Sequence, residues 1–501
     1  MTAFQYAIPA GCLALLMSST GALAQVTAQQ VWDDWKGYLS VYGEDGVTIG
    51  SETYANGVLT VSDLAFSMTQ EGMTVGGGMD LITLTEQADG SVLVAMPDTY
   101  PITVTGTDSD GMSIDLAMTL NQAGSTFNVS GAPGNMTYVV AVPRYELTVD
   151  HLMVDGEPGP LDMVVGANNV GGTYITSVTG DIRNIAYDLS IDSIDIKASA
   201  VEPGTSNSFT MSGTFNAITG QSTIAMPLDM TGIAPEDIMS SGFMIAADQA
   251  FGAAQMTINV SDSGTTLQAM VDMTGGTASV AMGGTAFDYG FAFQGMNLRA
   301  SGDEMPFPVA FSADEVGMRV AVPMTAGDMP QDFAALLNLT GISLNDEIWT
   351  MFDPSGVIPR DPATFRVDMS GAVTLLVDLT SPDLESMDSA PGLLNSLSIN
   401  DVTVSFGGAD AHATGAFTFD NSDMTTFEGM PRPTGKLDIA LNGVNGLIEK
   451  LVQVGLVPAE QVMGMSMMLG MFSVPVGDDQ LTSTIEFTAD GALLANGQRL
   501  Q

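Results

Sequence analysis

Strand-like alternation of apolar and polar residues dominates the chain over residues 47–230. Residues 189–192 and, further on, 365–369 alternate strictly, which is the period of a strand with one buried face. Short runs rich in Val, Ile, Thr, Leu and Met are separated by dipeptides that tolerate positive φ and favour tight turns: Asn56-Gly57, Asp89-Gly90, Asp110-Gly111 and Asp155-Gly156. Sequential strands joined in this way form a meander. The predicted fold class is therefore mainly β with some α (α+β), a large antiparallel β-meander, curled or elongated, with a few packed helices.

A helical period appears first near the N-terminus. Thr27 and Gln30 form a capping-box pattern, and Gly43 is a natural stop. Between them, apolar residues recur at i, i+4, i+7 and i+11: Val31, Trp35, Tyr38 and Tyr42. Further segments are predicted to be helical: 235–249, 332–339, 346–352, 446–454 and 458–472.

Strands are expected again over residues 255–323, where the pairs Gly275-Gly276 and Gly283-Gly284 indicate turns or bulges. Residues 481–488 and 492–495 flank Asp490-Gly491 and predict a final hairpin. The expected organisation has four parts: a signal peptide (1–24), an N-terminal helix (25–43), a first antiparallel β region (44–232) and a second β region with helices (233–501). The helix near Pro235 is the expected seam, although one continuous domain is the alternative.

The first residues resemble a signal peptide. The apolar run over residues 7–17 is too short to span a bilayer, and Ala22-Leu23-Ala24 places small residues at both positions of a cleavage site. Cleavage there would remove Cys12, the only cysteine, and with it any disulfide, Cys-bound metal or thiol nucleophile. No later stretch approaches the roughly 18 apolar residues of a membrane helix. The mature chain is therefore predicted to be periplasmic and to lack a membrane span.

The charge balance is strongly acidic, with 12 Lys and Arg against 58 Asp and Glu and a net charge of −46. Such a surface repels nucleic acid and anionic lipid headgroups. The acidity could serve solubility in a salty medium, divalent-cation binding or a basic partner, and solubility is the simplest interpretation. Disorder is a poor fit, because 45% of the residues are hydrophobic and only 14% are charged.

One element resembles a known family. Residues 346–354 (DEIWTMFDP), followed by Ile358 and the segment 359–362 (PRDP), look like the signature of the domain of unknown function 2125 family. Residues 32–35 resemble its mature N-terminus and residues 304–309 its strand before the helix. The Met-rich stretch up to Phe472 and residues 495–499 also match its pattern, so the resemblance covers essentially the whole mature chain. It implies an exported protein of Gram-negative bacteria. Because the family is uncharacterised, it implies no activity, cofactor or catalytic residue.

Candidate catalytic residues are few. His151 and His412 are the only histidines, and neither accompanies a nucleophile or phosphate-binding motif, so both are interpreted as strand or loop residues. Asp108 and the following residues to Gly111 look like the middle of a calcium loop. However, Ala117 occupies the closing position, which needs a carboxylate, and a hairpin turn is preferred. Acidic pairs leave carboxylate-based hydrolysis open.

Methionine is abundant, with 35 residues, and some lie at helical spacing near the C-terminus: Met463, Met467 and Met471, with Met465 and Met468 nearby. Thioethers bind Cu(I), but a helix face packed into a β-sheet core explains the spacing and is preferred. Arg360 lies between Pro359 and Asp361. A structural pairing of Arg360 with carboxylates is preferred to contact with a ligand carboxylate.

The sequence alone thus favours a non-enzymatic periplasmic envelope protein that holds a lipid or another apolar ligand in a β-lined groove. A lipid or another envelope protein is the expected partner, nucleic acid is not, and no catalytic, metal-binding or cofactor-binding residue is assigned. Two alternatives stay open: a structural or protein-interaction scaffold without a ligand, and a carboxylate-based hydrolase of envelope material.

Overall fold

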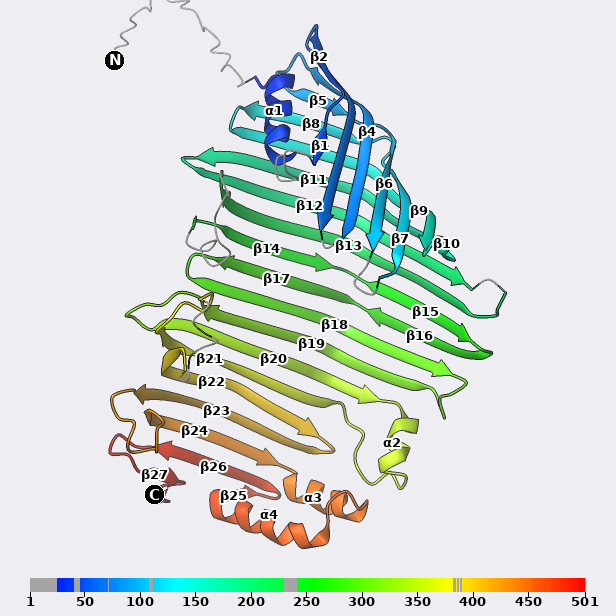
Figure 1. Ribbon diagram of the computed structural model, residues 1–501. Coiled ribbons are helices and arrows are strands. Elements are labelled where there is room, and N and C mark those ends of the chain that lie inside the picture. The colour runs from blue at the N-terminus through cyan, green and yellow to red at the C-terminus, as the bar shows by residue number, and fades with distance from the viewer. Residues whose placement is uncertain are drawn as a thin grey trace, which may run out of the picture.

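The chain folds into one long antiparallel sheet, shown by a computed structural model that describes residues 25–39, 46–70, 72–107, 111–202, 204–228, 241–381, 384, 387 and 390–500. Its strands lie side by side, so the sheet forms an elongated ribbon whose long axis runs across the strands, with helix α1 near one end and helices α3 and α4 at the other (Figure 1). The predicted class, mainly antiparallel β with some helix, is confirmed. The predicted signal peptide, Cys12, Tyr42 and the aspartates of the calcium-like loop lie outside the described residues.

The N-terminal end of the sheet is branched. Its strands are β1 (Val47–Thr48), β2 (Ser51–Ala55), β3 (Val58–Gln70), β4 (Met73–Glu86), β5 (Val92–Ala95), β6 (Thr99–Thr107), β7 (Ser113–Asn121), β8 (Thr126–Ala132), β9 (Asn135–Val154) and β10 (Glu157–Pro158). One half of β4 pairs with β5 and the other with β6, while the two halves of β9 pair with β8 and β7. Strands β4 and β9 are therefore connected in two ways, through the pair β5–β8 and through the pair β6–β7. The sheet curls in this region.

The remainder of the sheet follows chain order except that β13 also pairs with β15, β14 pairs with β17, β16 pairs with β18, and β24 pairs with β26. Its strands are β11 (Leu161–Thr179), β12 (Ile182–Val201), β13 (Ser208–Pro227), β14 (Met244–Phe251), β15 (Ala254–Asp262), β16 (Thr265–Met273), β17 (Gly275–Gly283), β18 (Ala286–Gly302), β19 (Val309–Pro323), β20 (Gln331–Leu344), β21 (Ala363–Leu375), β22 (Gly392–Phe406), β23 (Ala409–Asp420), β24 (Arg432–Asn442), β25 (Val474–Gly477), β26 (Gln480–Phe487), β27 (Leu493–Ala495) and β28 (Gln498–Arg499). Strands β14 and β15 lie end to end along β13, and β17 and β16 lie end to end along β18.

Most of the helices and turns that local sequence patterns predicted are present in the structure. The helices are α1 (Ala28–Leu39), α2 (Asp346–Phe352), α3 (Val444–Gln453) and α4 (Ala459–Phe472), so four of the predicted helical segments are confirmed. The capping box forms as predicted: the Thr27 amide donates to Gln30 Oε1 at 2.9 Å, and the Gln30 amide donates to Thr27 Oγ1 at 3.3 Å. Asn56 and Gly57 both have positive φ, 53° and 79°, in the turn that joins β2 to β3. The final hairpin also forms, from β26 and β27.

Two predicted helices are wrong where the structure describes them. Residues 332–339 belong to strand β20, which pairs with β19 on one side and β21 on the other. The described part of 235–249 that follows residue 243 belongs to strand β14. Both segments carry apolar residues on each face, for example Leu336 beside Leu337, so the spacing of their apolar residues did not distinguish a helix from a strand. Non-local pairing with neighbouring strands decided the outcome.

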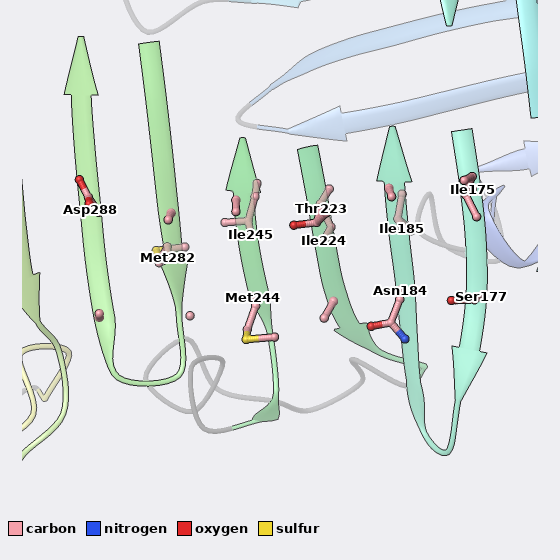
Figure 2. Close-up of a pocket in the computed structure, with 16 residues that line it drawn as sticks. Ile175, Ser177, Asn184, Ile185, Thr223, Ile224, Met244, Ile245, Met282 and Asp288 are labelled. Carbon is pink, nitrogen blue, oxygen red and sulfur yellow. The ribbon is translucent and has the colours of Figure 1, made fainter. Parts of the chain in front are cut away.

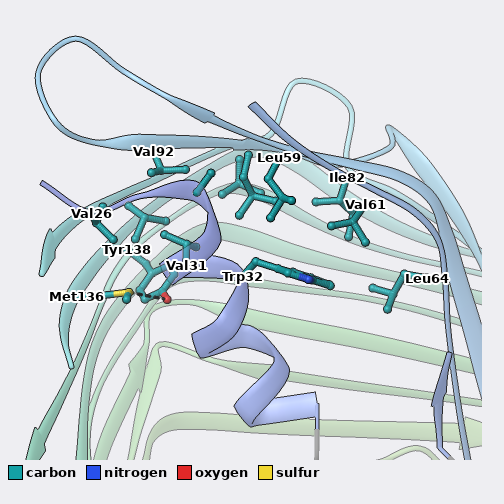
Figure 3. Close-up of a cluster of buried hydrophobic side chains, with 14 residues drawn as sticks. Val26, Val31, Trp32, Leu59, Val61, Leu64, Ile82, Val92, Met136 and Tyr138 are labelled. Carbon is teal, nitrogen blue, oxygen red and sulfur yellow. Dashed lines mark hydrogen bonds between the residues drawn. The ribbon is translucent and has the colours of Figure 1, made fainter. Parts of the chain in front are cut away.

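The buried core lies under the curled N-terminal end. Fourteen buried side chains form one cluster in which Val31 and Trp32 of α1 point into residues of the surrounding strands, among them Val61 and Ile82 (Figure 3). Beyond it the sheet is thin. In the strands from β14 to β24 the buried apolar side chains are Ala254, Ala313, Leu375 and Ala409, three of them alanines, and Trp349 and Ile358 are buried in the segment between β20 and β21. Most of the sheet therefore has no conventional core.

Candidate functional site: an uncovered apolar face

Cross-strand register defines which side chains share a face of the sheet, because paired residues point to the same side. One unbroken line of paired residues crosses the ribbon from β9 to β26: Val140, Gly172, Leu189, Gly220, Gln249, Ala278, Phe291, Met318, Leu337, Val367, Val402, Ala413, Ile439 and Ser483. The line contains no charged residue, and only Gln249 and Ser483 are polar.

A second line runs beside the first, two residues along each strand except where a bulge intervenes. It comprises Tyr138, Tyr174, Tyr187, Ser222, Ala247, Val280, Tyr289, Val320, Ala335, Met369, Ile399, Gly415, Leu437 and Ile485. It also contains no charged residue. We call the surface formed by these two lines the apolar face.

The opposite face is polar. The adjacent register line there comprises Thr173, Asp188, Gln221, Asp248, Ser279, Gly290, Arg319, Leu336, Asp368 and Asp401. Its cations are paired: Arg319 Nη2 lies 2.7 Å from Asp288 Oδ2, and Arg366 Nε lies 3.0 Å from Asp401 Oδ2. The ribbon is therefore amphipathic across its thickness, and the acidic residues gather on one side of it.

Among the described residues, helices α1, α3 and α4 cover the two ends of the apolar face, and Trp349 of α2 stacks on Phe406 of β22 on the same side of the sheet, 5.8 Å between ring centroids. At the N-terminal end, α1 and the sheet enclose a hollow of about 540 Å³ lined by Trp32, Trp35, Leu64, Phe66, Met79, Ile82, Met96, Tyr138, Val140 and Tyr174. Helix α1 is fixed there by Asp34, whose carboxylate accepts a 2.9 Å hydrogen bond from Tyr138 Oη and faces Arg183. Tyr138 and Val140 begin the two apolar lines, so this hollow opens on the apolar face.

A second hollow lies at the C-terminal end, between α3, α4 and the sheet. It has a volume of about 590 Å³ and is lined by Ile439, Leu441, Val444, Leu447, Ile448, Leu451, Met465, Met468, Leu469, Phe472, Ser473, Ser483 and Ile485. Ile439, Ser483 and Ile485 end the two apolar lines. The two helix-lined hollows are thus connected by one continuous face.

Between the hollows the apolar face is open. Tyr289 and Leu337 are each 38% exposed, Val404 is 39% exposed and Phe365 is 40% exposed. Phe365 and Val404 are paired with each other on the same face. An antiparallel sheet commonly packs its apolar face on a core, and large contiguous apolar surfaces of soluble proteins mark binding sites. This face is therefore the candidate site.

Aromatic rings form a connected band on this face. The rings of Phe215 and Phe251 lie 5.7 Å apart, those of Phe251 and Phe293 lie 6.3 Å apart, and those of Phe291 and Phe293 lie 5.3 Å apart. Tyr289 continues the band at 6.3 Å from Phe291. Such rings offer broad apolar area with few rotatable bonds, which suits contact with flexible hydrocarbon.

A further hollow, of about 470 Å³, lies on the polar face where β11 to β14, β17 and β18 end (Figure 2). It arises because a line of mostly small paired residues, Ile175, Ala186, Thr223, Ala246 and Ala281, leaves space beside Asp288. The carboxylate of Asp288 is held by Arg319, whose hydrogen bonds lower the pKa of Asp288. The other polar residues that line it are Ser177, Asn184 and Thr223, and we assign this hollow no role.

The two histidines lie on different strands, β9 and β23. His151 Nε2 lies 3.6 Å from Asp115 Oδ1, and the ring is about half exposed. His412 Nδ1 lies 2.9 Å from Thr403 Oγ1 on the polar face. Both histidines are strand residues, which agrees with their interpretation from the sequence. Across the part of the chain that the structure describes, no three His, Cys, Asp or Glu side chains are arranged to hold a metal ion.

The predicted core role of the methionine stripe is wrong. Met463, Met467 and Met471 are 76%, 63% and 57% exposed. Met465 and Met468 instead line the hollow against the sheet. Because α4 is apolar on all sides, helical spacing could not reveal which side meets the sheet.

The family-like signature forms a compact corner beside α2. Arg360 pairs with the carboxylate of Asp346, as the structural interpretation predicted. Asp353 is fully buried and accepts hydrogen bonds from the amides of Val357 at 3.0 Å and Ile358 at 2.8 Å. Desolvation opposes ionisation of Asp353, but these hydrogen bonds and the charge of Arg360 keep its pKa below the ordinary value. These contacts tie the corner together within the chain.

These features define a class: an open, elongated antiparallel sheet with one polar face and one largely uncovered apolar face. A family model described as "Uncharacterized protein conserved in bacteria (DUF2125)" matches residues 197–500, so the chain belongs to this family, as its signature indicated. No curated protein is significantly similar to the chain. Among the helices in the described segments, none combines the length and apolarity needed to cross a membrane.

Proposed function

We propose that this protein binds the acyl chains of lipids on its apolar face and carries them through the periplasm. The observation that supports this proposal is the continuous apolar face, uncovered between two helix-lined hollows. Acyl chains need contact with apolar side chains and no hydrogen bonds, and both apolar lines supply that contact without a single charge.

The dimensions suit lipid. Neighbouring strands lie about 4.8 Å apart, so a line across fourteen paired residues extends roughly 60 Å along the sheet. That is about twice the ~30 Å hydrocarbon thickness of a bilayer. The face could hold acyl chains at several places along its length, with the aromatic band in its middle part.

A protein ligand is less well supported than a lipid. Protein interfaces carry about one hydrogen bond per 100–200 Å². Apart from its tyrosines, the apolar face offers only Gln249, Ser222 and Ser483 as side-chain donors. Of the 28 residues in the two lines, 14 are Val, Leu, Ile, Met or Phe and seven are Ala or Gly, so most of the face offers no hydrogen-bonding side chain. The hydrolase alternative needs two carboxylates facing one cleft, whereas the two apolar lines contain none.

Location in the periplasm follows from the proposed cleavage after Ala24. Val26 and Ala28 are buried, with 3% and 0% exposure, so such cleavage would leave every residue of the buried cluster in place. The polar face, rich in Asp, would keep a lipid-loaded protein dispersed among anionic envelope surfaces.

The test compares two adjacent leucines of β20. Leu337 lies on the apolar face, and Leu336 lies on the polar face beside Arg319 and Asp368. The protein is purified from its own envelope and examined by native mass spectrometry and organic extraction. We expect co-purified lipid in the unmodified protein and in Leu336→Asp, and at least a several-fold loss in Leu337→Asp. Absence of lipid from the unmodified protein, or equal retention by both variants, would refute the proposal.

A further inference from the structure

Helix α4 and strand β25 present an exposed apolar surface at the C-terminal end of the ribbon, distinct from the apolar face. We define this tip by its exposed side chains: Met463 (76%), Met467 (63%), Met468 (58%), Met471 (57%), Val474 (44%) and Val476 (60%). Residues 459–477 contain one charged residue, Glu460, in a chain of net charge −46. From these features, and given the lipid-carrying function proposed above, we infer that the tip docks the protein on zwitterionic lipid bilayers.

The tip is continuous with the C-terminal hollow. Met468 and Phe472 are 58% and 38% exposed, yet both also line the hollow. On the sheet side of this hollow, Ile439 and Ile485 are the ends of the apolar lines. An acyl chain leaving a bilayer at the tip would therefore meet apolar side chains without interruption as far as the apolar face.

The packing of α4 is consistent with such a passage. None of its side chains is fully buried, whereas Ile448 of the neighbouring helix α3 is 5% exposed. The helix therefore rests on the sheet with space beneath it, and the hollow of about 590 Å³ measures that space. A lipid tail can occupy it without displacing a packed core.

A bilayer fits the tip better than a second copy of the chain. A specific protein interface requires side chains of defined shape and polar groups at its rim, and methionine specifies packing poorly. Fluid acyl chains require neither. The acidity of the rest of the chain repels anionic headgroups, which restricts the preferred bilayer to zwitterionic lipid and orients the ribbon end-on.

Vesicle flotation tests the inference with the whole mature protein and phosphatidylcholine vesicles. The variant Met463→Gln/Met467→Gln replaces two tip residues by side chains of similar helix propensity, and Met463→Asp/Met467→Asp adds charge. Met329→Asp is the matched control, because Met329 is 74% exposed and lies between β19 and β20. We expect unmodified protein and Met329→Asp to float, binding to fall several-fold in the Gln variant, and at least tenfold in the Asp variant, with unchanged circular dichroism.

Lipid retention separates this inference from the proposed function. If the Asp variant keeps co-purified lipid but does not float, both proposals stand. If the unmodified protein floats but carries no lipid, and the Asp variant does not float, docking stands and lipid carriage fails. Equal flotation of all variants, or no flotation of the unmodified protein, overturns docking. A dimer in light scattering that the Asp variant dissociates would instead assign the tip to a second copy and also overturn it.

Discussion

The ring of Phe215 packs edge-on against the ring of Phe251, with 5.7 Å between centroids and planes at 78°. Phe251 lies on the apolar face, where its ring approaches Gly276 and Phe293. In a regular strand, Phe215 would lie on the opposite face from Ile218, three residues away. Ala217, with φ of 51°, lies between them in β13 and shifts by one residue the alternation of side chains between the two faces. The left-handed residue thereby keeps both halves of this strand apolar on the same side.

Ala217 should consequently prefer glycine. A left-handed conformation costs a non-glycine residue about 1–2 kcal/mol, so Ala217→Gly is expected to raise the free energy of unfolding by about 1 kcal/mol. Ala217→Val should lower it, because a β-branched side chain tolerates positive φ poorly. Urea denaturation measures both. Ala246→Gly, in the neighbouring strand β14, is the control and should be destabilising by about 0.5–1 kcal/mol. A loss of stability in both glycine variants would contradict this account.

The corner around Asp353 should depend on its carboxylate. In Asp353→Asn, one of the two acceptor oxygens becomes an amide group, which cannot accept the hydrogen bond from Val357 or Ile358. Leaving a buried amide unsatisfied costs about 1–3 kcal/mol, and we expect the free energy of unfolding to fall by that amount. Asp361→Asn changes an exposed carboxylate in the same segment and should have little effect. Equal urea midpoints for the two variants would exclude the proposed role of Asp353.

Local chemistry made part of this fold predictable from sequence. The capping box of Thr27 and Gln30 and the turn at Asn56-Gly57 depend on residues close in the chain, and both form as predicted. The strand over residues 332–339 depends on partners in β19 and β21, which a local pattern cannot identify. The exception at Ala217 is also invisible in sequence, because alanine carries no signal of positive φ.

The candidate site was predictable only in outline. A β-lined groove for an apolar ligand was expected, because a meander of half-buried strands has one apolar face. Its path depends on the register of many strand pairs, so Leu337 could not be distinguished from Leu336 by local composition. The exposed position of Met463 was missed for a related reason: α4 has no polar side that would mark its outer surface.

The buried cluster under α1 should depend on the volume of Trp32 and not on its indole N–H. Trp32 is 1% exposed, and its Nε1 has no hydrogen-bond partner among the described residues. Trp32→Ala should therefore lower the free energy of unfolding by about 3–5 kcal/mol, as large-to-small core changes do. Trp32→Phe removes no hydrogen bond and should cost less than half of that. Guanidinium denaturation followed by near-ultraviolet circular dichroism measures both, and a Phe variant as unstable as the Ala variant would show that the N–H contributes.

Acid should weaken the loop after β23 in a defined pH window. The hydroxyl of Ser422 donates to Asp420, and this bond, together with Arg432 and the Ser422 amide, lowers the pKa of Asp420 to about 2. The hydroxyl and amide of Thr426 likewise lower the pKa of Asp423. A carboxylate with a depressed folded-state pKa stabilises the fold fully above its unfolded value, about 3.9, and this contribution disappears as the pH falls toward 2.

Total stability is a poor measure of this effect, because protonating the other carboxylates relieves repulsion in a chain of net charge −46. The difference in free energy of unfolding between the unmodified protein and Asp420→Asn isolates it. That difference should be constant from pH 7 to about 5 and approach its acid limit between about pH 4 and 2. Ser422→Ala removes the leading hydrogen-bond donor and raises the pKa of Asp420. The difference in free energy of unfolding between Ser422→Ala and the double variant Ser422→Ala/Asp420→Asn should therefore reach its acid limit at a higher pH. Urea titrations at several pH values measure these four proteins, and a difference between the unmodified protein and Asp420→Asn that does not change below pH 4 would contradict the role given to Asp420.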